Sequence, residues 1–244
     1  MTQVVPLNPT AHGKLRVKGQ ADVQASAGQQ ILPLVVHEFT QAGNDTPVVF
    51  VKDATNEQFQ PVQLLGLAQG ENLLVDGQRW LGGYIPFILR GAPFRLMKTS
   101  PDAEQVTVGI DEDSPLVSEE EGEALFNEDG SPSDYLQQRR DDLQRYVQQG
   151  QLTEAFVKRL MELDLLVPQE LNLELAGQKS NITGIYLVSE QKLRELDDAT
   201  TLDLNRRGFL VAIHAHLMSL GQTRRLARLK LDAAGAAGAR VRGA

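Results

Sequence analysis

The segment 72–94 constrains the fold of this chain more than any other stretch. It holds the only tryptophan among 244 residues, one of four tyrosines, two prolines and four glycines. Asp76-Gly77 lies between an apolar run and Trp80, which predicts a tight hairpin, because glycine accepts positive φ. Pro86 predicts the first turn of a short helix, where its missing N–H is no loss, and Gly91 can end that helix. The segment is therefore expected to be a hairpin followed by one helical turn.

The large side chains of this segment have two interpretations. Trp80, Tyr84 and Phe94 are expected to be core anchors by default, because aromatic rings bury large areas. Arg90 differs, since an arginine beside so much apolar surface needs a carboxylate or carbonyl partner, which is either internal or a ligand. If the segment is instead a binding surface, Trp80, Tyr84 and Arg90 are its predicted partner contacts.

The first half of the chain predicts mainly strands. Runs rich in β-branched residues, bounded by Pro, Asn, Asp and Gly, predict strands at 46–51, 61–67, 94–97 and 105–110. A short helix is expected at 37–43. The N-terminal half is therefore predicted to be antiparallel and β-rich, with short helices.

The second half predicts helices around one β-hairpin. Apolar residues at helical spacing predict helices at 119–126, from 134 to a stop at Gly150, from Thr153 to before Pro168, at 207–220 and at 222–231. Alternating runs at 171–175 and 182–188 predict the hairpin. The fold class is therefore α+β, with one domain over 1–232. The low-complexity tail 233–244 is expected to be disordered.

Composition and charge exclude several classes of protein. The chain has no cysteine, which rules out disulfides, thiolate chemistry and cysteine-ligated zinc. Its net charge of −8, with no basic residue between Lys98 and Arg139, argues against a nucleic-acid partner. The sequence contains no apolar run of about 18 residues, which predicts no membrane span. The first residues lack the basic head and the apolar core of a signal peptide, so we expect a cytoplasmic protein.

No catalytic, metal or cofactor site is predicted. His214 and His216 are two apart on an expected helix, so they point in different directions and are poorly placed to share an ion. We expect one to pack in the core and the other to face a partner or solvent. The acidic runs that begin at 111 and 127 lack glycine at position six and glutamate at position twelve of a calcium loop, and both are interpreted as turns and helix caps. Nucleophile-elbow, phosphate-loop and zinc-protease motifs are absent from the sequence.

Three segments of the chain resemble the SapC family, named for a surface-layer-associated protein of Gram-negative bacteria. They are Pro6-Leu-Asn-Pro-Thr-Ala-His12-Gly-Lys-Leu-Arg-Val17, then Asn72-Leu with Trp80, Tyr84-Ile-Pro86, Arg90 and Pro93-Phe94, and finally Ile213-His-Ala-His216-Leu-Met-Ser219-Leu. The resemblance covers almost the whole chain, with the segments in the expected order. Members usually carry Arg-Tyr before Pro-Phe, whereas this chain has Gly91-Ala92 and lacks that tyrosine.

The resemblance implies an accessory role, because the family has no established activity or catalytic residues. Its members are often encoded near flavin-dependent halogenases, cupin-like oxygenases and outer-membrane receptors. The leading hypothesis is a SapC-like binding protein for a peptide, a protein or such a modifying enzyme, linked to modification of peptides or surface proteins. One alternative is an enzyme that uses His12, His37 or the His214/His216 pair with carboxylates. A purely structural surface-layer role is a third, disfavoured by the expected lack of an export signal.

Overall fold

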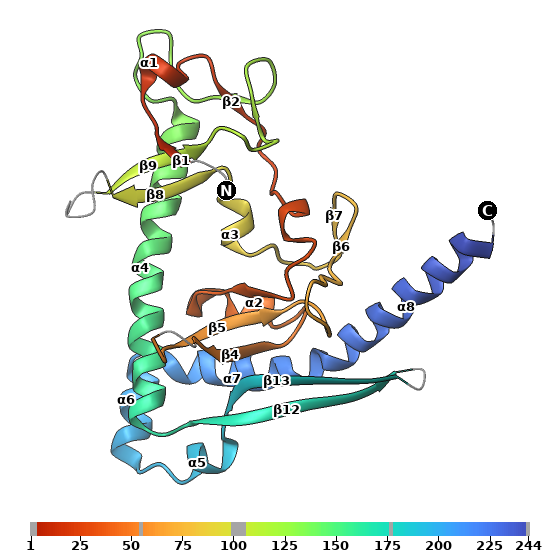
Figure 1. Cartoon of the computed structure of the whole chain (residues 1–244). Coiled ribbons are helices and arrows are strands. Elements are labelled where there is room, and N and C mark those ends of the chain that lie inside the picture. The colour runs from red at the N-terminus through yellow and green to blue at the C-terminus, as the bar shows by residue number, and fades with distance from the viewer. Residues whose placement is uncertain (1–3, 54–55, 99–105, 176–177, 243–244) are drawn as a thin grey trace. The chain divides into compact units, whose positions relative to one another are not determined.

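The computed structural model describes residues 4–53, 56–98, 106–175 and 178–242 (Figure 1). The strands are β1 (Val4–Pro6), β2 (Arg16–Val17), β3 (Ile31–Pro33), β4 (Val48–Lys52), β5 (Phe59–Leu64), β6 (Val75–Asp76), β7 (Arg79–Trp80), β8 (Phe94–Lys98), β9 (Val106–Asp111), β10 (Val117–Ser118), β11 (Glu123–Ala124), β12 (Leu166–Leu175) and β13 (Gln178–Val188). The α-helices are α1 (Pro9–His12), α2 (Phe39–Ala42), α3 (Phe87–Arg90), α4 (Asp134–Glu162), α5 (Glu190–Arg194), α6 (Asp198–Arg206), α7 (Phe209–Ser219) and α8 (Thr223–Arg242). The 3₁₀ turns are η1 (Gln24–Ser26), η2 (Val36–Glu38) and η3 (Leu220–Gln222). The predicted α+β class is confirmed.

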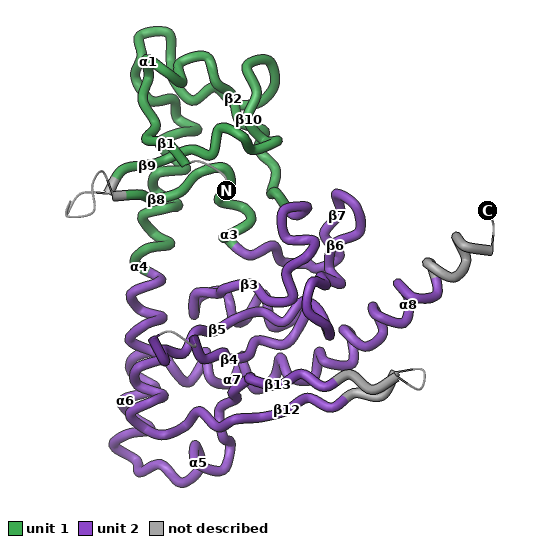
Figure 2. The backbone as a smooth tube through the Cα atoms, in the orientation of Figure 1, with its two compact units in different colours: residues 1–22, 87–148 green, residues 23–86, 149–244 purple. Residues whose placement is uncertain are grey.

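The chain divides into two compact units that are interleaved in sequence. Unit 1 comprises residues 1–22 and 87–148, and unit 2 comprises residues 23–86 and 149–244 (Figure 2). Helix α4 begins in unit 1 and ends in unit 2. The division describes compactness and does not test independent folding, so the single domain over 1–232 stays a prediction. Helix α8 continues to Arg242, through most of the tail for which disorder was expected.

Unit 1 is built from two small antiparallel sheets and the first half of α4. The strand orders are β1-β9-β8 and β10-β2-β11. Its core contains Val17, Phe94, Ile110 and Leu125, each at most 1% exposed, together with Leu136 of α4. Phe94 is therefore a core anchor, as predicted for it. Burial of each such side chain contributes roughly 1.5–3 kcal/mol.

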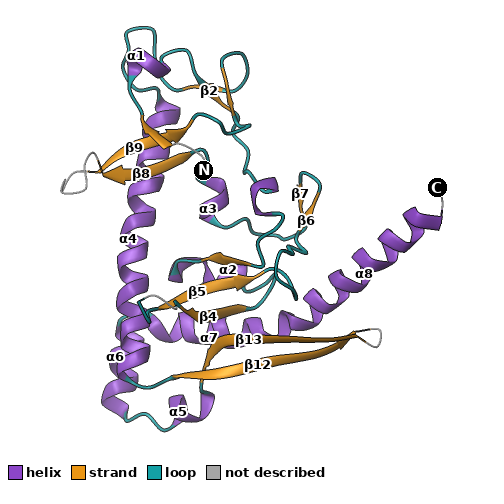
Figure 3. Cartoon of the chain, in the orientation of Figure 1, coloured by secondary structure: helices purple, strands orange, loops and turns teal. Residues whose placement is uncertain are grey.

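Unit 2 is a five-stranded antiparallel sheet with an apolar core on each face. The strand order is β12-β13-β4-β5-β3, with all neighbours antiparallel. Figure 3 labels four of these strands, β12, β13, β4 and β5, which are drawn in orange. Side chains alternate along a strand, so β4 sends Val48 and Phe50 into a core shared with α2, α4 and α7. The intervening Val49 joins a second core that contains Leu226 of α8. The helices therefore enclose the sheet from both faces.

The buried His216 of α7 completes the pairing of β13 with β4. These strands are paired at Ile185 with Val51 and at Tyr186 with Phe50, a register that two residues farther along places Val188 opposite Val48. The His216 imidazole hydrogen-bonds to the backbones of both Val188 and Val48. Val188 N–H donates to Nε2 at 3.1 Å, and Nδ1 donates to the Val48 carbonyl at 2.7 Å.

Two expected helices differ in the structure. No helix forms at 119–126, because β10 and β11 both pair with β2 there. Gly122 reverses the chain at φ 110°, and a Cβ on it would lie 2.5 Å from the Val17 backbone. Gly150 does not end its helix, since α4 continues through it. A glycine costs a helix only about 1 kcal/mol, and burial of Phe156 and Leu160 farther along α4 outweighs this cost.

Two further differences concern the hairpin and α6. The predicted hairpin is confirmed but longer, since β12 begins at Leu166. The predicted turn at 176–181 is shorter than expected, because β13 already begins at Gln178. Residues 176–177 of this turn lie outside the described residues. Helix α6 was not predicted, since it presents few apolar residues and its Leu202 is 46% exposed. The side chain of Asp197 caps it by accepting the Thr200 N–H.

The free energy of unfolding should decrease as the pH drops below 6.5, the pKa of a free histidine. Burial lowers the pKa of His216 from 6.5 to about 4, since the charged ring is poorly solvated in the core. The unfolded chain therefore binds the proton first. The stability from neutral His216 is complete above pH 6.5 and is lost as the pH falls toward 4, a change of about 3 kcal/mol. Urea unfolding of wild type and His216→Gln at several pH values measures this change.

The exposed His214 provides the matched control. His214→Gln should keep the wild-type stability at pH 7.5, whereas His216→Gln should be less stable at pH 7.5 and lose less stability on acidification. Parallel profiles for wild type and His216→Gln would contradict the prediction.

Candidate functional site

The hairpin predicted at Asp76-Gly77 is present and leads into the candidate site. Val75 pairs with Trp80 and Asp76 with Arg79, leaving a two-residue turn in which Gly77 has φ 59°. The loop Leu81–Tyr84 follows and carries the second predicted contact. Both elements belong to unit 2.

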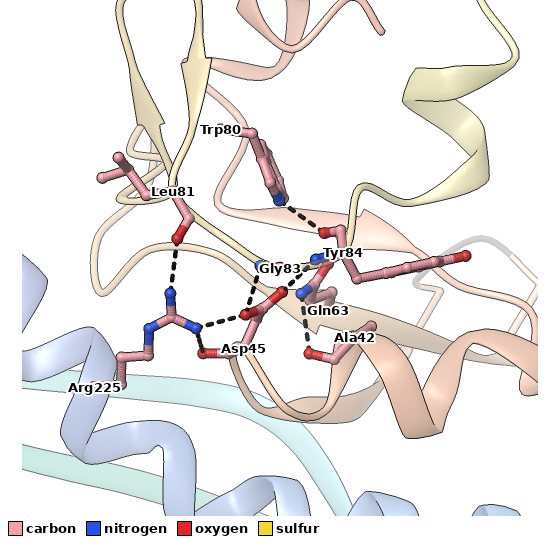
Figure 4. Close-up of polar contacts among 8 residues, drawn as sticks. All are labelled: Ala42, Asp45, Gln63, Trp80, Leu81, Gly83, Tyr84 and Arg225. Carbon is pink, nitrogen blue, oxygen red and sulfur yellow. Dashed lines mark hydrogen bonds and ion pairs between the residues drawn. The ribbon is translucent and has the colours of Figure 1, made fainter.

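A buried carboxylate, Asp45, holds this loop (Figure 4). Asp45 is 5% exposed and follows α2. Its Oδ1 accepts the Gly83 N–H at 2.9 Å, and its Oδ2 accepts the Tyr84 N–H at 2.9 Å. Arg225 of α8 donates from Nη1 to Oδ1 at 2.6 Å and from Nη2 to the Leu81 carbonyl at 2.8 Å. The loop is therefore tied both to α8 and to the turn after α2.

The polar groups of the two aromatic side chains are bonded within unit 2. Trp80 donates its indole N–H to the Tyr84 carbonyl at 2.7 Å (Figure 4). The Tyr84 hydroxyl donates to Oε1 of the buried Glu38 at 2.8 Å. Both aromatic side chains are partly exposed. Their polar atoms therefore fix the rings in place, while each side chain keeps part of its surface exposed.

Gly82 is required by this packing. A Cβ at this position would lie 2.6 Å from Trp80 Nε1 and 2.7 Å from Asp45 Oδ2. Either approach is closer than van der Waals contact permits, so any side chain at Gly82 would displace the indole or the carboxylate.

The structure brings Trp80 and Tyr84 together, whereas the third predicted contact belongs to unit 1. Arg90 ends α3 and is exposed, with its Cζ 5.8 Å from the centroid of the Phe87 ring. That ring stacks on Tyr146 at 4.5 Å. A cation above an aromatic ring is a favourable arrangement, so the Phe87 ring is one contact of Arg90.

Two of the four histidines have both ring nitrogens engaged in the fold. In His12, Nδ1 accepts the Asn8 N–H at 3.0 Å and Nε2 lies 3.0 Å from Glu112 Oε1. His216 bridges β4 and β13, while His214 is exposed on α7. The predicted division of this pair, with one in the core and one outside, is confirmed. The alternative enzymatic use of these histidines stays untested.

Neither Asp45 nor Arg225 was predicted from the sequence as a site residue. Asp45 lies in a run of turn-forming residues, and Arg225 lies in a basic stretch, so each has an ordinary local explanation. The two are 180 residues apart. No spacing rule connects positions at that separation, and only the folded chain reveals the pair.

Comparison with known protein families matches the SapC family model to residues 7–226. The chain belongs to the SapC family. The match includes the second and third segments that suggested it, all of the first segment except Pro6, and both Asp45 and Arg225. No curated protein and no solved structure gives a significant match. Within the described part of this SapC-family chain, none of the helices has the length and apolar character needed to cross a membrane.

Removing the Asp45 carboxylate should destabilise this SapC-family chain strongly. Asp45→Ala leaves two backbone donors and the Arg225 guanidinium without their acceptor, at a cost of about 3 kcal/mol. Urea unfolding measures the loss, and emission from Trp80, the only tryptophan, reports whether the loop loosens.

The exposed Asp76 in the same hairpin is the control, and Asp76→Ala should change stability by less than about 0.5 kcal/mol. Equal stability of the Asp45→Ala and Asp76→Ala variants would show that the contacts of Asp45 with the loop and Arg225 contribute little.

Proposed function

We propose that this SapC-family chain is a cytoplasmic accessory protein that binds a peptide, a protein or a modifying enzyme. Its contacts are Trp80, Tyr84 and Arg90. The partner classes suggested by the family resemblance are flavin-dependent halogenase and cupin-like oxygenase systems that modify peptides or surface proteins. Neither a cofactor nor a nucleic acid forms part of the proposal.

The observation that carries the proposal is the fixed presentation of two aromatic rings. The Leu81–Tyr84 loop is held by Asp45 and Arg225. Trp80 and Tyr84 each keep part of their surface exposed. Rigid aromatic side chains bind with a small loss of conformational entropy and are enriched at binding hot spots. This combination favours a recognition surface.

Arg90 supports the proposal independently within unit 1. Its side chain is exposed, and its guanidinium lies beside the Phe87 ring. Arginine is enriched at protein interfaces, where it combines apolar contact with directed hydrogen bonds.

Affinity capture of the tagged full chain from its native lysate, followed by mass spectrometry, tests the proposal. Wild type should retain a specific protein, and Trp80→Ala and Arg90→Ala should each retain at least about tenfold less of it, a typical loss at a binding hot spot. Circular dichroism must show that both variants remain folded.

Arg95→Ala is the matched control for Arg90→Ala, because Arg95 is also an exposed arginine of unit 1. It should leave capture unchanged. Capture that is insensitive to both Trp80 and Arg90 would refute the contact assignment. Absence of any specific partner would favour the enzyme alternative.

A further inference from the structure

A small cavity in unit 2 contains none of the residues considered above as partner contacts. It measures about 260 Å³ and is lined by residues of η2, α2, α4, the α6–α7 turn and α7. Its apolar walls are formed by Val36, Leu152, Phe209, Val211 and Ala212. Cavities for drug-sized molecules measure roughly 300–1,000 Å³. This cavity is smaller, so it fits one large side chain of a ligand together with one adjacent polar group of that ligand.

Three polar side chains line the same cavity and retain hydrogen-bonding capacity. Arg207 donates from Nε to Asp203 at 2.7 Å, and within the described part of the chain its two Nη groups make no further hydrogen bond. The side chains of His37 and Thr40 make none with any described residue. An apolar pocket with a few convergent polar groups is the usual form of a ligand site.

The charge of the cavity differs from that of the chain as a whole. None of its nine lining residues is acidic, although the chain carries a net charge of −8. The carboxylate nearest Arg207 is that of Asp203, which also pairs with Arg159 at 3.2 Å. Because Asp203 is shared, Arg207 can still bind a second carboxylate through its Nη groups.

Apolar side chains of α7 are also exposed beyond the cavity, on a face that includes the exposed His214. Val211 is 64% exposed and Met218 is 80% exposed. The two are seven residues apart, and therefore lie on one face of the helix. A ligand longer than one residue can thus extend from the cavity along α7.

We propose that this cavity binds a peptide segment in which a leucine-like side chain is adjacent to a carboxylate. The side chain packs against Val36, Leu152 and Val211, and the carboxylate accepts hydrogen bonds from Arg207. The inference goes beyond the proposed function, because it assigns a ligand class to a site separate from Trp80, Tyr84 and Arg90. The carboxylate is supplied either by a chain terminus or by an acidic residue.

Methyl-resolved NMR of the full-length chain tests the inference with three probes. N-acetyl-leucine carries a terminal carboxylate, and its amide, N-acetyl-leucinamide, has the same size without the charge. N-acetyl-leucyl-aspartyl amide carries a side-chain carboxylate. We expect at least one carboxylate probe to shift the methyl signals of Val36, Leu152 and Val211, with a dissociation constant on the order of 1–10 mM for so small a ligand. N-acetyl-leucinamide should bind about tenfold more weakly.

Two neighbouring exposed arginines give a matched pair of variants. Arg207→Gln should abolish the preference for carboxylate, whereas Arg206→Gln, outside the cavity lining, should leave it unchanged. Val211→Asp should weaken the binding of both carboxylate probes, because it places a second negative charge in the cavity wall.

Either of two results would overturn the inference. One is that neither carboxylate probe binds more tightly than N-acetyl-leucinamide, and the other is the absence of shifts at all three methyl positions. The titrations do not depend on partner capture, so their failure is distinguishable from failure of the proposed function.

Discussion

The Asp45 carboxylate is the contact on which the arrangement of unit 2 depends. It binds two backbone donors of the Leu81–Tyr84 loop and the Arg225 guanidinium of α8, joining positions 180 residues apart. A charge this deeply buried is favourable only when several donors surround it. The segment just before Asp45 serves both candidate surfaces. Glu38 accepts from Tyr84, while His37 and Thr40 line the cavity.

Much of the fold was predictable where a local pattern decides the structure. Runs of β-branched residues bounded by turn formers identified β4 and β5, alternating apolar residues identified the β12–β13 hairpin, and Asp76-Gly77 identified the β6–β7 turn. The third family segment, Ile213 to Leu220, marked a helix with one histidine inward and one outward. These features depend on side-chain period and turn chemistry, which are encoded within a few residues.

The remainder depends on contacts that local patterns do not encode. The continuation of α4 through Gly150 depends on tertiary burial of its second half, and the strands that replace the expected helix at 119–126 depend on pairing with β2. In the candidate site, the sequence singled out Trp80 and Tyr84 by residue type. It could not reveal Asp45 or the cavity around Arg207, because both are assembled from segments distant along the chain.

The interleaving of the two units has a consequence for synthesis on the ribosome. Residues 23–86 emerge early, but their sheet lacks β12 and β13 until residues 149–244 follow. Pairing of β4 with β13 must therefore wait through synthesis of most of unit 1, and it closes a long chain loop at an entropic cost. Until then β4 presents an unpaired edge, a segment that molecular chaperones are suited to shield.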